Sequence, residues 1–308
     1  MSSETKADVY TRVTNKILAD LEQGVRPWAK PWSGEHAAGR ITRPLRGNGQ
    51  PYRGVNILLL WASAIEQGFS CPVWMTYKQA QELGANVRKG ERGSLVVYAN
   101  TFIKTEANEQ TGEDEEKQIP FMKGYTVFNV EQIEGLPAHF TATAEPAPET
   151  IEQRDERLER FFRNTGATIR HGGNRAFFNI TADFVQMPPF PAFVDAASYY
   201  ATLGHEMTHW TRHPSRLDRD LGRKKWGDEG YAREELVAEL GSAFLCADLG
   251  ITPEVRDDHA AYIGSWLEAL KDDKRFIFSA VAHAQRALDW LHRCQADKIE
   301  EEEKREAA

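Results

Sequence analysis

The sequence of 308 residues is poor in cysteine and has no long apolar run. Its three cysteines, Cys71, Cys246 and Cys294, are odd in number and widely spaced, which argues against a disulfide framework and for a reducing compartment. No stretch approaches the roughly 20 apolar residues of a membrane-spanning helix. The start of the chain lacks the charged segment and apolar core of a signal peptide. The sequence therefore predicts a cytoplasmic protein without a membrane partner.

The composition is that of an ordinary globular protein, with 41% hydrophobic and 27% charged residues. A run rich in Pro and Ala, without a large apolar residue, occupies positions 141–150 and is typical of an interdomain linker. We therefore expect an N-terminal domain over 1–140, a second domain over 151–295 and an acidic disordered tail over 296–308.

The first domain is expected to mix helices and strands. Apolar periodicity predicts helices over 7–24, 56–67 and 76–83. Two stretches rich in β-branched and aromatic residues, 95–104 and 121–130, predict a hairpin, and the acidic segment 105–118 between them predicts a mobile loop.

Aromatic and cationic residues alternate in the loops between residues 24 and 56, where prolines and glycines are frequent. Such loops are typical of a platform for single-stranded nucleic acid, on which bases stack on aromatic rings and cations follow the phosphates. Residues 1–95 carry 13 Lys plus Arg against 8 Asp plus Glu, a net charge of +5. Since the net charge of the whole chain is −8, residues 96–308 carry a net charge of −13. The residues predicted to bind DNA are Arg26, Trp28, Lys30, Trp32, Arg43, Arg46, Tyr52, Arg53, Trp74, Arg88 and Lys89.

Two alternatives stay open for this region. The four residues Trp28, Trp32, Trp61 and Trp74 could be core aromatics beneath solvated arginines. The polyanion could also be double-stranded DNA rather than a single strand.

The segment of the sequence that most clearly indicates a catalytic or metal-binding site is His205-Glu206-Met207-Thr208-His209. Apolar residues recur at helical spacing from 195 to 212, so the run is expected on a helix, where the two imidazoles leave the same face one turn apart. They could hold one metal ion between them, and the adjacent Glu206 could accept a proton from an attacking water and pass it to a leaving amine. The alternative is an amphipathic helix with two surface histidines.

A second helix is expected over 228–250 and offers the third ligand that a catalytic zinc site needs. We expect Glu235 on the metal and Glu239 to accept a hydrogen bond from a ligand imidazole, with Glu234 as the competing ligand. Tyr231 could donate to an oxyanion in catalysis or simply cap the helix. The ion is expected to be Zn2+, although such a site also accepts Mn2+ or Co2+.

The helices and strands predicted around these two helices are also consistent with a metal-dependent hydrolase domain. The sequence predicts a helix over 151–164, short strands near 168–170, 176–180 and 184–187, and two covering helices over 252–270 and 275–293. This order is that of a zinc peptidase core of the zincin kind. An edge strand, either 177–180 or 183–186, would accept an extended peptide. The basic connection 212–226 is expected to carry solvated charge, or to steer an acidic substrate or DNA towards the metal.

Five sequence blocks, 9–32, 50–56, 74–93, 205–217 and 231–245, resemble the ArdC-type antirestriction proteins of conjugative plasmids. They are also similar to the N-terminal part of plasmid-encoded conjugative primases. The resemblance implies an N-terminal domain that binds single-stranded DNA and a C-terminal metallopeptidase-like domain of the gluzincin type. It also implies that the protein protects incoming plasmid DNA from restriction in a bacterial cell.

The sequence thus predicts an α+β protein of two domains with an antirestriction function. A host restriction enzyme or another protein is the expected substrate if the second domain cleaves peptides. One alternative is a metallopeptidase whose basic domain serves only for targeting. A nuclease is disfavoured, because nucleases more often use carboxylate-rich, two-metal sites.

Overall fold

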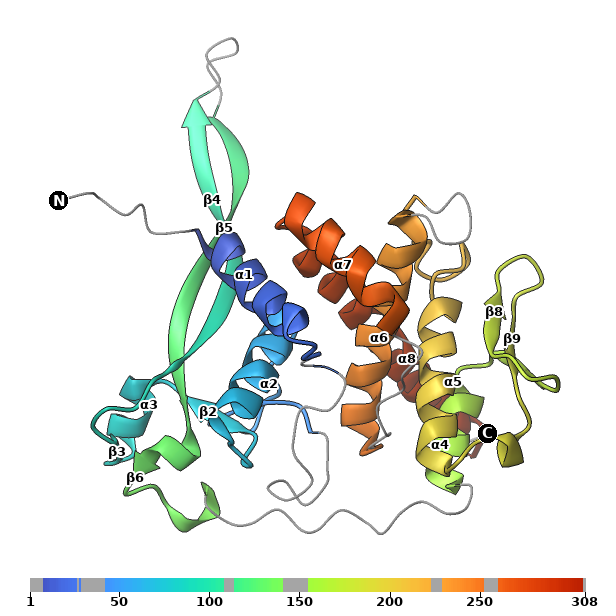
Figure 1. Cartoon of the computed structure of the whole chain (residues 1–308), viewed down its shortest axis with the longest axis horizontal. Helices are drawn as coiled ribbons and strands as arrows, with labels where there is room; N and C mark the ends of the chain where they lie inside the picture. Colours follow the sequence, from blue (N-terminus) through green and yellow to red (C-terminus); the bar gives the residue numbers. More distant parts are fainter. Residues whose placement is uncertain are drawn as a thin grey trace.

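The computed structural model describes residues 8–26, 28, 42–107, 114–140, 155–222, 229–251 and 260–306. A strand-rich first half lies beside a mainly helical second half (Figure 1). The predicted α+β class is therefore confirmed. In the part of the chain that is described, every helix is too short or too polar to cross a bilayer.

Within its described residues, the first half contains three α-helices, two short 3-10 helices and two sheets. The helices are α1 (Val9–Glu22), α2 (Val55–Gln67), α3 (Tyr77–Glu82), η1 (Val130–Gln132) and η2 (Ala138–Phe140). The larger sheet has the order β1-β2-β5-β4 and the smaller one pairs β3 with β6. The strands are β1 (Leu45–Arg46), β2 (Val73–Met75), β3 (Asn86–Val87), β4 (Ser94–Ala107), β5 (Asp114–Asn129) and β6 (Ile133–Glu134).

Local signals fix the ends of these helices. The Asp8 carboxylate caps α1 by accepting a hydrogen bond from the amide of Thr11 at 2.8 Å. A reciprocal capping box between Thr76 and Gln79 begins α3. Gly68 ends α2 with a φ of 72°, a conformation in which glycine is unstrained.

The β4–β5 hairpin is longer than the sequence predicts. Its antiparallel register runs from Ser94 opposite Val127 to Ala107 opposite Asp114. The prediction of a mobile loop over 105–118 is therefore wrong for 105–107 and 114–118, because the backbone ladder continues through them despite their acidic composition. In Figure 1 the hairpin extends beyond the end of α1 as a two-stranded ribbon.

The second half places a small sheet against a helical group. Its strands are β7 (Thr168–His171), β8 (Phe177–Asn179) and β9 (Phe184–Met187), in the order β7-β9-β8. Its helices are α4 (Glu156–Asn164), η3 (Phe190–Ala192), α5 (Ala196–Trp210), α6 (Glu229–Leu249), α7 (Ala260–Asp272) and α8 (Phe276–Glu306). Of the two stretches considered as a peptide-binding edge, β8 lies at an edge and β9 lies in the centre.

The last helix corrects the prediction of a disordered tail from residue 296. Helix α8 continues to Glu306 without a break. The segment is rich in Glu, Lys and Arg, which are good helix formers. An acidic composition therefore does not by itself end a helix whose preceding turns are buried.

One continuous apolar core joins the two halves. The rings of Trp61 on α2 and Phe244 on α6 lie 5.9 Å apart, and those of Trp28 and Trp266 lie 6.1 Å apart. Arg43, whose side chain is 11% exposed, forms an ion pair with Asp248 at 3.1 Å across the same boundary. The halves therefore share buried surface and are not joined by the chain alone.

Candidate metal centre

Helices α5 and α6 approach each other closely because a glycine faces the middle of the histidine motif. A Cβ atom at Gly241 of α6 would lie 2.5 Å from Cγ2 of Thr208, so no other residue fits there without a shift. Gly204 of α5 lies against Leu245 in a similar way, with 3.3 Å to the place of a Cβ. This spacing brings the carboxylates of α6 within reach of the imidazoles of α5.

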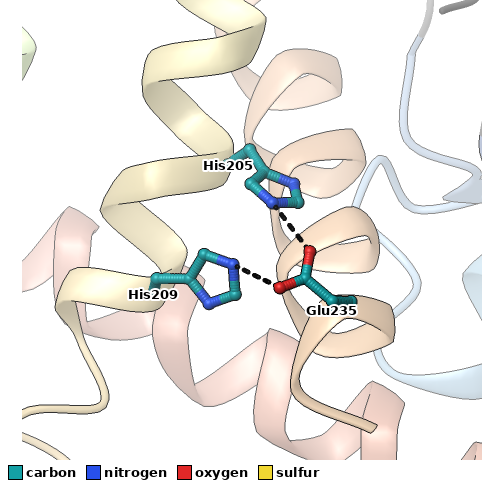
Figure 2. A group of neighbouring side chains, drawn as sticks. All are labelled: His205, His209 and Glu235. Atoms are coloured by element: carbon teal, nitrogen blue, oxygen red, sulfur yellow. Dashed lines mark ion pairs between the residues drawn. The ribbon is translucent and has the colours of Figure 1, made fainter. Parts of the chain in front are cut away.

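Three of the predicted ligands converge (Figure 2). Nε2 of His205 lies 3.5 Å from Oε2 of Glu235, and Nε2 of His209 lies 3.6 Å from Oε1 of the same carboxylate. All three donor groups offer atoms within 4.8 Å of one another, and their side chains are 10–15% exposed. Tetrahedral ligands about 2.0–2.1 Å from a zinc ion are separated by about 3.4 Å, which is close to these distances.

The donor set therefore fits a divalent metal ion. Within the described residues, it is the one group of three or more His, Cys, Asp or Glu side chains that meets the distance criteria for a metal site. Two imidazoles and one carboxylate suit zinc and similar ions.

Glu234 is not positioned as a ligand but orients one. Its Oε1 lies 3.0 Å from Nδ1 of His209, on the other side of the ring from Glu235. When Nδ1 carries the proton and donates to Glu234, the lone pair of Nε2 is directed towards the ligand cluster. Glu234 thus has the positioning role that the sequence analysis gives to Glu239.

Arg219 holds Glu234 in place. The guanidinium donates to both carboxylate oxygens, at 2.9 Å from Nε to Oε2 and 2.7 Å from the terminal nitrogen to Oε1. It also donates to the carbonyl of Thr208 and the hydroxyl of Thr211. Arg219 is 4% exposed and Glu234 is 1% exposed, so this is a buried, fully bonded pair beside the metal ligands.

Arg219 is not among the predicted site residues, because the connection 212–226 is expected from the sequence to carry solvated charge. That prediction is wrong for two of its residues, since Arg219 is buried and Arg216 pairs with Asp183 and lies 3.9 Å from the Trp210 ring centroid. A sequence signal exists in hindsight: a buried carboxylate on α6 requires a cation nearby.

Glu239 lies on the Nδ1 side of His205. The distance from its Oε1 to Nδ1 of His205 is 3.8 Å, which is longer than a hydrogen bond. The Glu239 carboxylate thus lies near a ligand imidazole, as expected, but it interacts with the His205 ring by charge and not by the predicted hydrogen bond.

The close contacts between carboxylates and imidazoles shift the pKa values of both kinds of group. Burial lowers the pKa of His209, but the charge of Glu235 and hydrogen bonds with Glu234 and Glu235 outweigh it and raise the pKa to about 10. Burial raises the pKa of Glu234, yet Arg219 and His209 bring it down to about 2. Burial likewise opposes the two histidines at Glu235, whose pKa nevertheless lies well below its usual range. The cluster therefore attracts positive charge.

The two predicted catalytic residues stay predictions. Glu206 follows His205 on α5 and is 7% exposed. Tyr231 lies on α6 one turn before Glu235 and is half-buried. Both lie close to the ligand cluster in sequence, and neither role is decided by the contacts of the cluster.

The aromatic residues predicted to bind DNA are mostly in the core. Trp28 is 2% exposed, Trp74 is 0% exposed and Tyr52 is 7% exposed, so their rings offer no open face to a base. Trp28 packs on Trp266, and Trp74 packs on Phe69. The alternative that tryptophans of this region are core residues is right for Trp28 and Trp74, because burying them removes a large apolar area from water.

The cations of the same set divide into two groups. Arg43 and Arg53 form ion pairs with Asp248 and Asp289 of the second half and so link the halves. Four others remain on or near the surface: Arg26 is half-buried, Arg46 lies 5.4 Å from the Tyr52 ring centroid, Arg88 pairs with Glu91, and Lys89 is exposed. The predicted Lys30 and Trp32 lie outside the described residues.

Two family models match the chain. A model described as a zincin-like metallopeptidase matches residues 156–283, which hold the ligand cluster. A model described as the N-terminal domain of anti-restriction factor ArdC matches residues 7–128.

Similar proteins cover the chain almost completely. Uncharacterized protein y4eC of Sinorhizobium fredii is 46% identical over 300 residues, which are 96% of this chain and 94% of that protein. A DNA primase TraC of Escherichia coli is 39% identical over 99% of this chain, but the match spans only 29% of the primase.

Solved structures agree with the sequence matches. The metal-free crystal structure of the antirestriction protein ArdC from plasmid R388 is 48% identical with a TM-score of 0.81, over 94% of this chain and 99% of that chain. The Mn(II)-bound structure of the same protein gives 46% identity and a TM-score of 0.76, over 94% of this chain and 98% of that one. A divalent ion is therefore known in a structure of the same overall fold.

Proposed function

The chain belongs to the ArdC antirestriction family, as its sequence motifs predict, and on this premise we propose that it protects incoming plasmid DNA from restriction during conjugation. The protein would do so by binding single-stranded DNA in the cytoplasm of the recipient or donor cell. The main support for this proposal is that 99% of the ArdC protein from plasmid R388 matches this chain at 48% identity.

The second half supports a zinc-dependent hydrolase centre. His205, His209 and Glu235 would hold the ion, which would supply Lewis-acid polarisation of a substrate carbonyl group. Glu206 would accept the proton of the attacking water and deliver it to the leaving amine. Glu234 keeps the Nε2 lone pair of His209 available, and Arg219 keeps Glu234 charged.

A transfer assay tests the antirestriction function. A plasmid carrying the full chain is conjugated into matched recipients with and without a restriction system, beside the same plasmid lacking the gene. We expect the chain to raise transfer only into the restricting recipient. Equal transfer with and without the chain in that recipient contradicts the proposal.

A second candidate is a metallopeptidase whose first half serves only for targeting. The set of three candidate ligands and the edge position of β8 favour it. The Glu206→Gln protein separates the two candidates, because it should keep the metal and the DNA affinity. Protection that survives in this variant assigns the effect to DNA binding. Protection that is lost, together with cleavage of a restriction enzyme or another host protein by the wild type alone, assigns it to peptide hydrolysis.

A further inference from the structure

One face of the β4–β5 ribbon carries an open row of aromatic rings. Residues opposite each other in an antiparallel pair share a face, and so do alternate residues along each strand. The register places Val96 opposite Tyr125, Tyr98 opposite Lys123 and Asn100 opposite Phe121. We call the set formed by Tyr98, Asn100, Phe121, Lys123 and Tyr125 the ribbon face.

The rings of the ribbon face form one cluster. The Tyr98 ring lies 6.1 Å from that of Phe121 and 6.3 Å from that of Tyr125. The Lys123 ammonium lies 5.6 Å from the Phe121 ring centroid, and the Asn100 amide donates to the Tyr98 hydroxyl at 2.7 Å. These contacts order the side chains before any partner arrives, which lowers the entropy cost of binding.

The cluster is nevertheless not part of the core. Tyr98 is 48% exposed and Tyr125 is 46% exposed, while Asn100 and Lys123 are also exposed. Nearer the base of the ribbon the same face is covered, since Val96 is 7% exposed and Ser94 lies 3.4 Å from Gln67 of α2. The rings therefore lie just past the end of that cover. A contiguous exposed aromatic patch of this kind usually marks a binding site.

We propose that the ribbon face binds single-stranded DNA, with bases stacking on Tyr98 and Tyr125 and a phosphate meeting Lys123. This inference rests on the proposed function and gives it a site in place of the buried tryptophans. The order ring, cation, ring along β5 matches how strand platforms bind single strands, because any base can stack and cations meet the backbone.

Charge gives the bound strand a direction along the ribbon. The turn before β4 carries exposed Lys89 and Arg92, which would attract phosphates. The strand is therefore expected to run from Phe121 towards the base of the ribbon.

Fluorescence anisotropy of a labelled oligonucleotide of mixed sequence tests the site on the full chain. The variants Tyr98→Thr and Tyr125→Thr keep a strand-forming residue but remove the ring. Each should weaken binding roughly 5- to 100-fold, which is the usual range for one lost stacking contact. Tyr98→Phe keeps the ring and should bind like the wild type. Lys123→Gln should reduce the slope of log affinity against log salt by about 0.7.

Two matched controls come from α3. Tyr77 is also 48% exposed but its ring packs on Phe128, outside the ribbon face, so Tyr77→Thr should keep its DNA affinity. Lys78 is exposed and pairs with Glu82, so Lys78→Gln should keep the salt slope. Thermal unfolding of every variant shows whether the fold is intact.

The outcomes separate this inference from the proposed function. Loss of affinity in the ribbon variants but not in the α3 variants supports the site. Affinities within twofold of the wild type for both ribbon tyrosine variants, or an equal loss in Tyr77→Thr, overturn the site while DNA binding itself stands. If the ribbon variants bind DNA normally but no longer protect the plasmid, the face binds a protein and the inference is wrong. A wild type without affinity for single-stranded DNA removes the proposed function as well.

Discussion

The metal centre and the ribbon face hold their functional groups in different ways. The three candidate metal ligands lie on two packed helices, and their side chains are 10–15% exposed. His209 is also held from behind by Glu234, which is itself held by Arg219. The ribbon face projects its rings from a single pair of strands and leaves Tyr98 and Tyr125 about half exposed. The centre therefore depends on tertiary packing, whereas the ribbon face depends mainly on strand register.

This difference predicts separable functions on an inseparable fold. A substitution within one site should leave the chemistry of the other site intact, because no residue is shared between them. A substitution in the common core should weaken both sites together, since Trp61, Phe244 and their neighbours belong to one cluster.

The largest effect is expected for Glu235→Ala. Removing one of three ligands should lower Zn2+ affinity by about a thousandfold or more, beyond the roughly 10- to 100-fold cost of disturbing an outer partner. Single-stranded DNA affinity should stay within twofold. Isothermal titration with Zn2+ and anisotropy with the oligonucleotide measure the two quantities. Zinc affinity that changes less than tenfold would show that Glu235 is not a ligand.

A core substitution should act on both halves. Trp61 is 0% exposed and packs on Phe244, so Trp61→Ala should cost about 3–5 kcal/mol of unfolding free energy. Urea unfolding followed by tryptophan fluorescence and by circular dichroism should give coincident transitions, both shifted to lower urea. Two separate transitions, with only one of them shifted, would mean that the halves unfold independently.

A smaller and selective effect is expected for Arg219→Met. Without the guanidinium, Glu234 is a buried charge with fewer partners and should orient His209 less well. Metal affinity should fall roughly 10- to 100-fold, as for other outer partners of metal ligands. Arg216→Met is the control, since it removes another buried arginine and its ion pair to Asp183. Equal losses of metal affinity in the two variants would assign the effect to general destabilisation.

The smallest effect is a change in acid sensitivity. Although burial raises it, the pKa of Glu234 is held at about 2 by Arg219 and His209, below its ordinary 4.5. A lowered folded pKa stabilises the protein above pH 4.5, and that contribution is lost as pH falls towards 2. In the metal-free protein, Glu234→Gln should therefore flatten the loss of stability across this window. An unchanged acid-unfolding profile would exclude Glu234 as a contributor.

How much the sequence predicts differs between the two sites for a physical reason. The pair His205 and His209 is fixed by helical period alone, and Glu235 follows from a second period on the next helix. The choice between Glu234 and Glu239 as the orienting carboxylate depends on how α6 is rotated against α5. Spacing along one helix cannot supply that rotation, and Arg219 reaches Glu234 from a connection whose path is set only by folding.

The prediction that bases stack on Trp28, Tyr52 and Trp74 is wrong, because these rings are buried. Trp28 and Trp74 lie in a sequence whose composition is typical of a stacking platform. Whether such a ring is exposed to solvent depends on which elements pack over it in the folded protein. The hairpin itself was predicted, with shorter strands than those observed. Its open face could not be predicted, because that face begins where the cover of α2 ends.

The narrow contact between Gly241 and Thr208 has one more consequence. We expect this contact to set the separation between α5 and α6 at the candidate metal centre, although neither Gly241 nor Thr208 is a proposed ligand. A methyl group added at position 241 would spread the two helices, and trimming Thr208 to alanine should allow them to close again. A substitution at position 241 should therefore change the ion radius that the candidate site prefers, although Gly241 is not one of the proposed ligands.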